Sequence, residues 1–360
     1  MVAPEVRRLH TLPDMRHLSS LAGFAFVSIV AAAVIPGCAA EQADDETSDE
    51  ALTAAPPLGP NPSGPKLKHA VVLAHGFDGS PTNRWGYNGV REALLADGHP
   101  VVHVAAVPPY DSSLVRAREL GKHVEAAREE CKAVRGCDPS KVNLIAHSMG
   151  GIDSRILISE LGFGGKVASL TTISTPHRGS AIADVLLKVM PGSADDAVNS
   201  LAKCWAKSFT TDELASQTHL RDALASIAEK NAPEFNRAHP DDGRVYYQSW
   251  AGVSNVMGVP NWKDFGACDD KLLNYRSRRD VMDATLAAGA PIVAHGTDIR
   301  PNDGMVTVES AKWGEFQGCI PADHLDEVGQ PGDDGPNKRT GFDHKRFYRN
   351  VAFGLARKGF

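Results

Sequence analysis

The stretch that decides the fold is Val142-Asn143-Leu144-Ile145-Ala146-His147-Ser148-Met149-Gly150-Gly151. Its first half has the composition of a buried strand, and apolar residues then recur at helical spacing over residues 152–161. Ser148 therefore stands at a turn from a strand to a helix. Such a turn strains the serine backbone and packs the strand closely against the helix, so small residues must flank it. Ala146 and Gly150 meet that requirement.

A serine at this turn has two interpretations. It is either a nucleophile presented by the turn or a cap for the helix that follows, which is a common role of serine. The capping interpretation makes no demand on the rest of the chain. The nucleophile needs a histidine and a carboxylate elsewhere, because a serine hydroxyl reacts poorly until a base removes its proton.

Strand and helix patterns alternate along the chain. We expect strands over residues 69–75, 101–107, 141–146, 167–173 and 244–249, and helices over residues 91–97, 113–132 and 342–358. This alternation predicts an α/β fold with a mostly parallel central sheet and helices on both faces. Ser148 then lies at the carboxyl end of a strand, where open sheets of this class bind their ligands.

The first 65 residues do not read as part of that fold. Residues 1–38 contain an apolar run that is too short for a membrane span and is typical of a signal peptide. The run Ile35-Pro36-Gly37-Cys38 resembles a lipobox, which predicts a lipid anchor on Cys38; the alternative is an ordinary secretory signal with an incidental cysteine. Residues 39–65 are acidic and then rich in proline, which predicts a disordered tether before a folded domain over residues 66–360.

Export would place the remaining cysteines in an oxidising compartment. Cys131 and Cys137 bracket a short loop and can pair locally. Which two of Cys204, Cys268 and Cys319 pair is left open by the sequence, and the spacings do not match a zinc site.

The loop after the first expected strand reads His75-Gly76-Phe77-Asp78-Gly79. A loop rich in glycine at this place can aim a backbone N–H at a developing oxyanion, and the residue after the nucleophile supplies a second N–H. The two donors would be Phe77 and Met149. Taken alone, the loop is equally a tight turn with a packing histidine.

Five blocks of sequence carry a resemblance to a known family. They are His75-Gly76-Phe77, His147-Ser148-Met149-Gly150-Gly151, Thr175-Pro176-His177-Arg178-Gly179-Ser180, Asn302-Asp303-Gly304-Met305-Val306 and His324-Leu325-Asp326-Glu327-Val328-Gly329-Gln330. In this order they resemble the bacterial triacylglycerol lipases, which are calcium-dependent, often foldase-assisted enzymes of the α/β-hydrolase fold. The resemblance runs over residues 66–330.

The resemblance implies a role for three side chains. Ser148 would be the nucleophile, Asp303 the acid and His324 the base of a catalytic triad, and the order serine, aspartate, histidine is the one that hydrolases of this fold use. Asp153 and Asp298 are the rival acids. Among the rival histidines, His295 and His344 are expected at the surface, and His177 is expected to order a loop.

The resemblance also implies a structural calcium ion beside the base. Its ligands would be Asp326, two residues after His324, and Asp283, with the carbonyls of Gln330 and Asp334. Oxygen donors of this kind suit calcium. Asp280 is the rival to Asp283, and the plainer alternative is that Asp326 only caps a turn.

The sequence therefore predicts an exported, monomeric serine carboxylester hydrolase that acts on acylglycerols, with a foldase as a possible partner. Similar lipases carry a helical lid where residues 181–240 read as successive helices, and a fixed cap is the alternative. An esterase for short or polymeric esters would use the same triad. A non-catalytic surface protein on a hydrolase scaffold is the rival of another class. The net charge of −6 and the lack of a nucleic-acid motif exclude nucleic acid as a partner.

Overall fold

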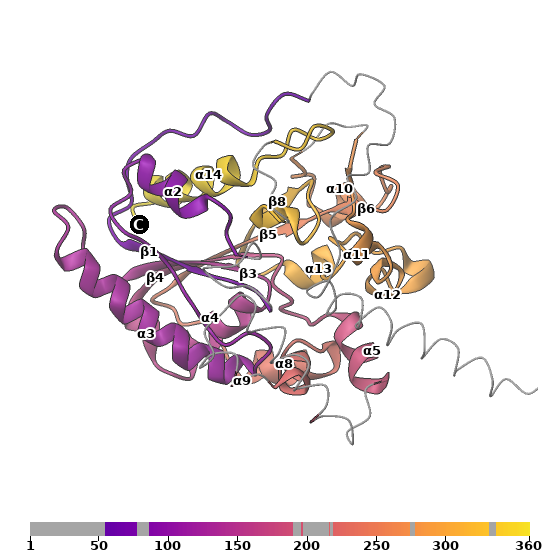
Figure 1. Cartoon of the computed structure of the whole chain (residues 1–360), viewed down its shortest axis with the longest axis horizontal. Helices are drawn as coiled ribbons and strands as arrows, with labels where there is room; N and C mark the ends of the chain where they lie inside the picture. Colours follow the sequence, from indigo (N-terminus) through magenta and orange to yellow (C-terminus); the bar gives the residue numbers. More distant parts are fainter. Residues whose placement is uncertain are drawn as a thin grey trace, which may run out of the picture. The chain divides into compact units, whose positions relative to one another are not determined.

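The structure is a computed structural model that describes residues 55–77, 86–189, 196, 216, 219–273, 278–330 and 336–360. Within these residues, six strands form one parallel sheet in the order β2-β1-β3-β4-β5-β8 (Figure 1). The strands are β1 (Ala70–Ala74), β2 (Val102–Val104), β3 (Val142–His147), β4 (Val167–Ile173), β5 (Tyr246–Gly252) and β8 (Glu315–Ile320). A small second sheet pairs β6 (Ser254–Asn255) with β7 (Asp280–Val281).

The strands form a sheet because nearly every residue of the central strands is buried. Strands covered on both faces read as continuous apolar runs, and successive side chains point to opposite faces. Val72 and Leu144 accordingly pack in one hydrophobic cluster, while Leu73 and Ile145 pack in another. The first cluster is covered by α3 (Ser113–Lys132) and α4 (Met149–Ser159), and the second by α2 (Val90–Ala96) and α14 (His344–Arg357), as Figure 1 shows.

Shorter helices fill the connections after β4. They are α5 (Ala181–Val189), α8 (Leu220–Ser226), α9 (Ala232–Ala238), α10 (Asp264–Ala267), α11 (Ala284–Ala287), α12 (Ala290–Val293) and α13 (Val308–Ala311), with 3-10 turns at Glu229–Asn231, Gly296–Asp298 and Asp326–Val328. One further 3-10 turn, Phe163–Gly165, precedes β4. In the part of the chain that the structure describes, none of the helices has the length and apolar character needed to cross a membrane.

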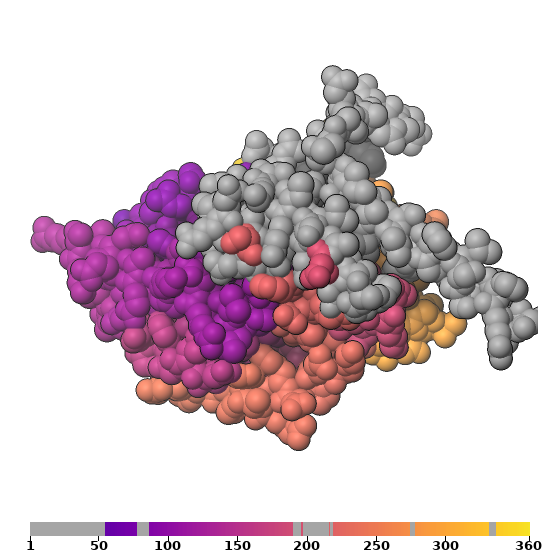
Figure 2. All heavy atoms as spheres, turned by 60° about the horizontal axis from the view of Figure 1, so that its bottom comes forward, coloured from indigo at the N-terminus to yellow at the C-terminus, as the bar shows by residue number. Residues whose placement is uncertain are grey.

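The helical segment expected over residues 181–240 is described only in part. Most of its middle part, including Cys204, lies outside the described residues. At its end, α8 stops at Ser226 because the backbone of Ile227 and Ala228 pairs with Ser180 instead. Helices α5 and α8 pack on Met149 and Ile152 of α4. Figure 2 looks at this side of the molecule, where coral atoms of the segment with α8 and α9 border the purple segment with α3.

Two expected elements have different bounds for local reasons. Strand β2 ends at Val104, since the carbonyl of Ala106 bonds instead to His123 Nε2 at 2.8 Å. Helix α14 begins at His344, because the side chain of Asp343 accepts the backbone N–H of Arg346 as a helix cap.

Residues 55–65, here called the strap, correct the predicted extent of the tether. They run along α14: the N–H of Leu58 donates to Gly341 O (2.9 Å), Arg346 donates to Gly59 O (3.0 Å) and Asn350 donates to Pro60 O (3.1 Å). A segment rich in proline has few N–H groups to donate but keeps its carbonyls, and the side chains of α14 bond to these. The folded part therefore begins by Ala55 and not at Lys66.

Two disulfides are present among the described cysteines. Cys131 pairs with Cys137 at the end of α3, which confirms the local pair expected from the sequence. Cys268 pairs with Cys319, and this bond joins the segment after α10 to the buried end of β8. The sequence had left this second pairing open.

Candidate active site

The turn between β3 and α4 holds Ser148 at φ 55° and ψ −132°, a conformation that costs most residues free energy. Close packing around the turn explains its small residues. A Cβ atom on Gly150 would stand 2.4 Å from the carbonyl oxygen of Ala74, and one on Gly151 would stand 2.1 Å from the hydroxyl of Thr175. The Ser148 side chain does not cap α4. The strained turn therefore leaves the hydroxyl available for another partner.

That partner is His324, from the loop after β8. Its Nε2 lies 2.8 Å from Ser148 Oγ, and its Nδ1 lies 2.8 Å from Asp303 Oδ2. Because the carboxylate can only accept, Nδ1 carries the proton and Nε2 accepts the serine O–H. The structure thus brings together the three residues that the sequence singled out, and all three are buried.

Backbone hydrogen bonds hold Asp303 in place. Its Oδ1 accepts the N–H groups of Met305 (2.8 Å) and Val306 (2.7 Å), and its main-chain oxygen accepts the N–H of His324 (2.9 Å). Only Oδ2 is left to face the imidazole. The segment between the acid and β8 therefore orients the acid and the base together.

The rival acids make other contacts. Asp298 is exposed and pairs with Arg300 at 3.1 Å. Asp153 is buried on α4, where its Oδ2 accepts Arg116 Nε at 2.8 Å. Burial raises the pKa of Asp153 to about 6, although the Arg116 guanidinium opposes that rise. Neither carboxylate is bonded to His324 in the described residues.

The rival histidines are also accounted for. His177 is buried and bonds to Thr172 at 3.1 Å, and His295 bonds to Glu229 at 3.0 Å. His344, expected at the surface, is buried instead, because its ring lies under Gly329 and donates from Nε2 to the carbonyl of Asn88 at 2.7 Å.

The two backbone donors expected for an oxyanion flank the serine. Met149 is the first residue of α4, so its N–H has no acceptor within the helix. On the other side, a Cβ atom on Gly76 would lie 2.9 Å from the Cβ of Ser148, which places the peptide between Gly76 and Phe77 directly beside the nucleophile. The Phe77 carbonyl accepts the N–H of Tyr110 at 3.1 Å.

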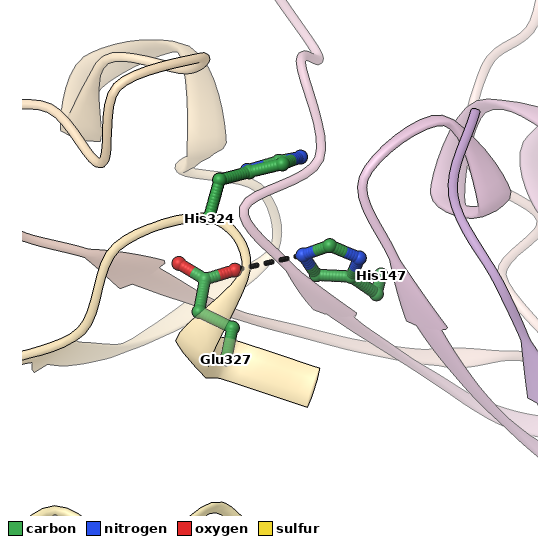
Figure 3. Close-up of side chains that lie close together, drawn as sticks. All are labelled: His147, His324 and Glu327. Atoms are coloured by element: carbon green, nitrogen blue, oxygen red, sulfur yellow. Dashed lines mark hydrogen bonds and ion pairs between the residues drawn. The ribbon is translucent and has the colours of Figure 1, made fainter. Parts of the chain in front are cut away.

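A buried carboxyl group that the sequence reasoning missed lies behind the triad. Glu327 Oε2 lies 3.0 Å from His147 Nε2, and Glu327 Oε1 accepts Ser174 Oγ at 2.5 Å. Figure 3 shows Glu327 pointing at His147, with the ring of His324 alongside; the two ring centroids are 4.5 Å apart. Glu327 stands three residues after His324, a spacing that a 3-10 turn brings to one side and that could have indicated it.

Burial and the nearby Asp303 charge raise the pKa of Glu327 well above its usual range. Burial, followed by the neighbouring His324, lowers the pKa of His147 well below its usual range. Both shifts favour the neutral form, and in that form a protonated Glu327 donates to His147 Nε2. Asp303 then lies beside a neutral pair rather than beside a second carboxylate.

Three carboxylates meet near the loop of His324. One oxygen each of Asp280, Asp323 and Asp326 lies within 4.8 Å of the others. Burial and the Asp323 charge raise the pKa of Asp280 to about 7, and burial raises that of Asp323. These groups and the set of His147, His324 and Glu327 are the arrangements in the described residues that could hold a metal ion.

The expected calcium ligands are only partly brought together. Asp326 belongs to the group, but the Asp283 carboxylate caps α11 through Thr285 N (2.7 Å), so Asp280 takes the place expected for Asp283. Gln330 donates from Nε2 to Gly86 O, while its buried Oε1 has no hydrogen-bond partner among the described residues. Asp334 lies outside the described residues.

Comparisons with known proteins agree with this geometry. The family model described as palmitoyl protein thioesterase matches residues 70–257. Triacylglycerol lipase 2 of Saccharomyces cerevisiae is 31% identical over 284 residues, which cover 76% of this chain and 73% of that protein. The chain belongs to the triacylglycerol lipase family.

Two further proteins are similar to most of this chain. A triacylglycerol lipase of Pseudarthrobacter phenanthrenivorans is 27% identical, covering 73% of this chain and 89% of its own. The crystal structure of a metagenomic carboxyl esterase has a TM-score of 0.58 at 14% identity, covering 88% of this chain and 82% of the esterase, which shows the fold alone. The protein is a carboxylic ester hydrolase on an α/β-hydrolase fold, and both expectations from the sequence are confirmed.

Glu327→Gln tests the neutrality of the buried pair. Glutamine can donate to His147 and accept from Ser174 without carrying charge, so this variant should keep the wild-type kcat and the wild-type pH profile of kcat/KM. Glu327→Leu removes both bonds and should lower the free energy of unfolding by about 1–3 kcal/mol. Thermal unfolding and ester hydrolysis measure the two effects. Equal damage in both variants would mean that Glu327 acts as an ionised group.

Proposed function

We propose that the protein is a triacylglycerol lipase that works through an acyl-enzyme on Ser148. The observation that carries the proposal is the continuous chain of hydrogen bonds from Ser148 through His324 to Asp303, at a strained turn beside two backbone N–H groups. A binding protein on a hydrolase scaffold would have no need of this arrangement.

In the first half of the reaction, Ser148 Oγ attacks the ester carbonyl while its proton moves to His324 Nε2. Asp303 holds the imidazole by Nδ1 and stabilises the imidazolium that forms. The N–H groups of Phe77 and Met149 donate hydrogen bonds to the carbonyl oxygen as negative charge develops on it. The carbon–oxygen bond to the alcohol then breaks, and the alcohol leaves with the proton from His324.

In the second half, water attacks the acyl-enzyme. His324 takes a proton from the water as the new carbon–oxygen bond forms, and the charge again rests on the two backbone N–H groups. Breakdown of this intermediate returns the proton to Ser148 Oγ and releases the fatty acid. Ser148, His324 and Asp303 therefore serve both halves of the reaction and end in their starting protonation states.

The apolar surroundings of Ser148 support an acyl substrate. Met149 and Ile152 follow it on α4 and pack with Leu220 and Leu224 of α8, while Phe77 and Tyr110 meet edge to face at 4.9 Å on the oxyanion side. Apolar side chains of this kind favour a hydrocarbon chain over a polar acid. The relatives found by sequence are named triacylglycerol lipases, and the solved structure with the same fold is a carboxyl esterase. Acylglycerols are therefore the first choice of substrate and soluble esters the second.

Rates on p-nitrophenyl esters of increasing chain length and on emulsified triolein separate the two substrate classes. A lipase should prefer long chains and hydrolyse the emulsion. Activity confined to short soluble esters would replace the lipase by an esterase with the same triad, without touching the proposed mechanism.

Substitutions of the triad test the mechanism itself. Ser148→Ala should leave only the acceleration from binding and the oxyanion donors, roughly 10³–10⁴ over water. Asp303→Asn should lower kcat by about 10⁴-fold, because the amide favours the wrong tautomer of His324. The control is Asp298→Asn, an exposed rival acid that should keep full activity. Substantial turnover by Ser148→Ala would refute the proposal.

We extend the proposal to a structural calcium ion held by Asp280, Asp323 and Asp326. Three carboxylates that converge in a mostly buried place repel one another, and a divalent cation with a preference for oxygen would remove that repulsion. The donor set therefore fits calcium. When bound, the ion would fix the loop that carries His324, and it would take no part in proton transfer.

Calcium binding has a thermal readout that is independent of activity. Chelation should lower the melting temperature of the wild type, and added calcium should restore it. Asp326→Asn should weaken this response. Asp283→Asn is the matched control, because that carboxylate caps α11 and lies outside the group; its response to calcium should equal that of the wild type. A melting temperature indifferent to chelator in the wild type would exclude the ion.

We also propose that the protein is exported and anchored through a lipid on Cys38. The apolar run over residues 21–35, the run that ends at Cys38 and the acidic stretch that follows support this. Mass spectrometry of the mature protein from its native host should find residue 38 at the amino terminus with a diacylglycerol mass. An unmodified Cys38, or a mature chain that begins elsewhere, would contradict the anchor.

A further inference from the structure

A buried arginine on α3 contacts the loop beside the nucleophile. Arg116 is fully buried, and its guanidinium donates to a carboxylate and to three backbone carbonyls. Nε bonds to Asp153 Oδ2 (2.8 Å), Nη1 to Pro108 O (2.9 Å), and Nη2 to both His75 O (3.0 Å) and Gly76 O (2.8 Å). A buried guanidinium is costly to desolvate, so a site that only needed filling would hold an apolar side chain.

The bond to Gly76 O has a consequence for the neighbouring residue. The Gly76 carbonyl and the Phe77 N–H belong to one peptide group, which is planar, and in a trans peptide the two point in opposite directions. Holding the carbonyl toward Arg116 on α3 turns the Phe77 N–H away from α3. This peptide also borders Ser148, whose Oγ would lie 3.3 Å from a Cβ atom on Gly76. His75 Nδ1 lies 3.0 Å from Gly76 O and holds the same carbonyl from a second side.

Arg116 also joins the two halves of the oxyanion site. Phe77 belongs to the loop after β1, whereas Met149 belongs to α4, and Arg116 bonds to both segments through Gly76 and Asp153. The distance between two donors matters as much as their direction, since an oxyanion needs both at about 2.7–3.1 Å. A hydrogen bond from a charged group to the carbonyl also polarises the peptide and strengthens its N–H as a donor.

We propose that Arg116 is the positioning residue of the oxyanion site, fixing the direction of the Phe77 N–H through Gly76 O and its distance from Met149 through Asp153. This inference rests on the proposed hydrolysis at Ser148. Arg116 does not touch the substrate. Its substitution should therefore weaken the binding of the tetrahedral state and leave the binding of the ground-state ester almost unchanged.

Arg116→Lys is the main variant, because it keeps the charge but cannot bond to four acceptors in the fixed geometry of a guanidinium. With p-nitrophenyl butyrate, kcat should fall by roughly 10²-fold, the loss expected for one impaired oxyanion donor, while KM stays within about threefold. An alkyl boronic acid gives a second readout. Its boron bonds to Ser148 Oγ, the serine proton passes to His324, and the tetrahedral adduct places an oxygen in the oxyanion site. Its inhibition constant should rise by a similar factor.

The matched control is Arg155→Lys. Arg155 is also a buried arginine and lies on α4, but it donates to Asn236 Oδ1 and His239 O, on the side away from the oxyanion loop. It should lose stability comparably and keep kcat and boronate affinity. Wild-type kcat and boronate affinity in a folded Arg116→Lys variant would overturn the proposal, as would equal losses in the control.

Asp153→Asn provides a second test in case the Arg116→Lys variant does not fold. Asparagine keeps an acceptor for Arg116 Nε but loses the charge, so kcat and boronate affinity should both fall by about tenfold. If Arg116→Lys is unfolded and Asp153→Asn behaves as the wild type, the positioning role is refuted. A wild-type enzyme that hydrolyses no ester, or whose activity survives Ser148→Ala, would instead refute the proposed function.

Discussion

The close approach of α4 to the end of β1 is the constraint on which the site depends. Gly150 packs so tightly on the carbonyl oxygens of Ala74 and His75 that no side chain fits between them. This contact holds Ser148 in its strained conformation, at a cost of order 1–3 kcal/mol that the buried strands on either side offset. It also brings the loop after β1 within reach of the serine. This packing contact therefore brings the nucleophile and the loop of the oxyanion donors together, and the hydrogen bonds of Arg116 set the direction of that loop.

Few of the described side chains around this contact carry a charge. His75 and Glu327 are both buried beside the site, and burial, the largest influence on each, lowers the pKa of His75 to about 3 and raises that of Glu327. These shifts favour the neutral form of both groups. The charges that remain are Asp303, held by backbone N–H groups, and the Arg116–Asp153 pair, which bond to one another. In a medium of low dielectric constant, each unpaired charge would disturb the charge that develops in the reaction.

The residues predicted from the sequence are those whose signal is local. The turn at Ser148 and the strand and helix periods around it can be read within a dozen residues, and chain order together with the family blocks picked out Asp303 and His324. Arg116 could not be found in this way, because its role depends on partners far along the chain. Glu327 offered only its three-residue spacing from His324, and its partner His147 stands 180 residues earlier. Asp283 lies outside the group of Asp280, Asp323 and Asp326 for a related reason. A short helix begins after Asp283, and its carboxylate caps that helix.

The strap places the start of the described fold beside α14. It runs beside α14 from Gly341 toward Arg357 before it enters β1, and the start of α14 lies by Gly329, on the loop that follows His324. Ala55, the first described residue, therefore lies beside the start of α14 and the loop after His324, at the carboxyl end of the sheet and not at the end where β1 begins.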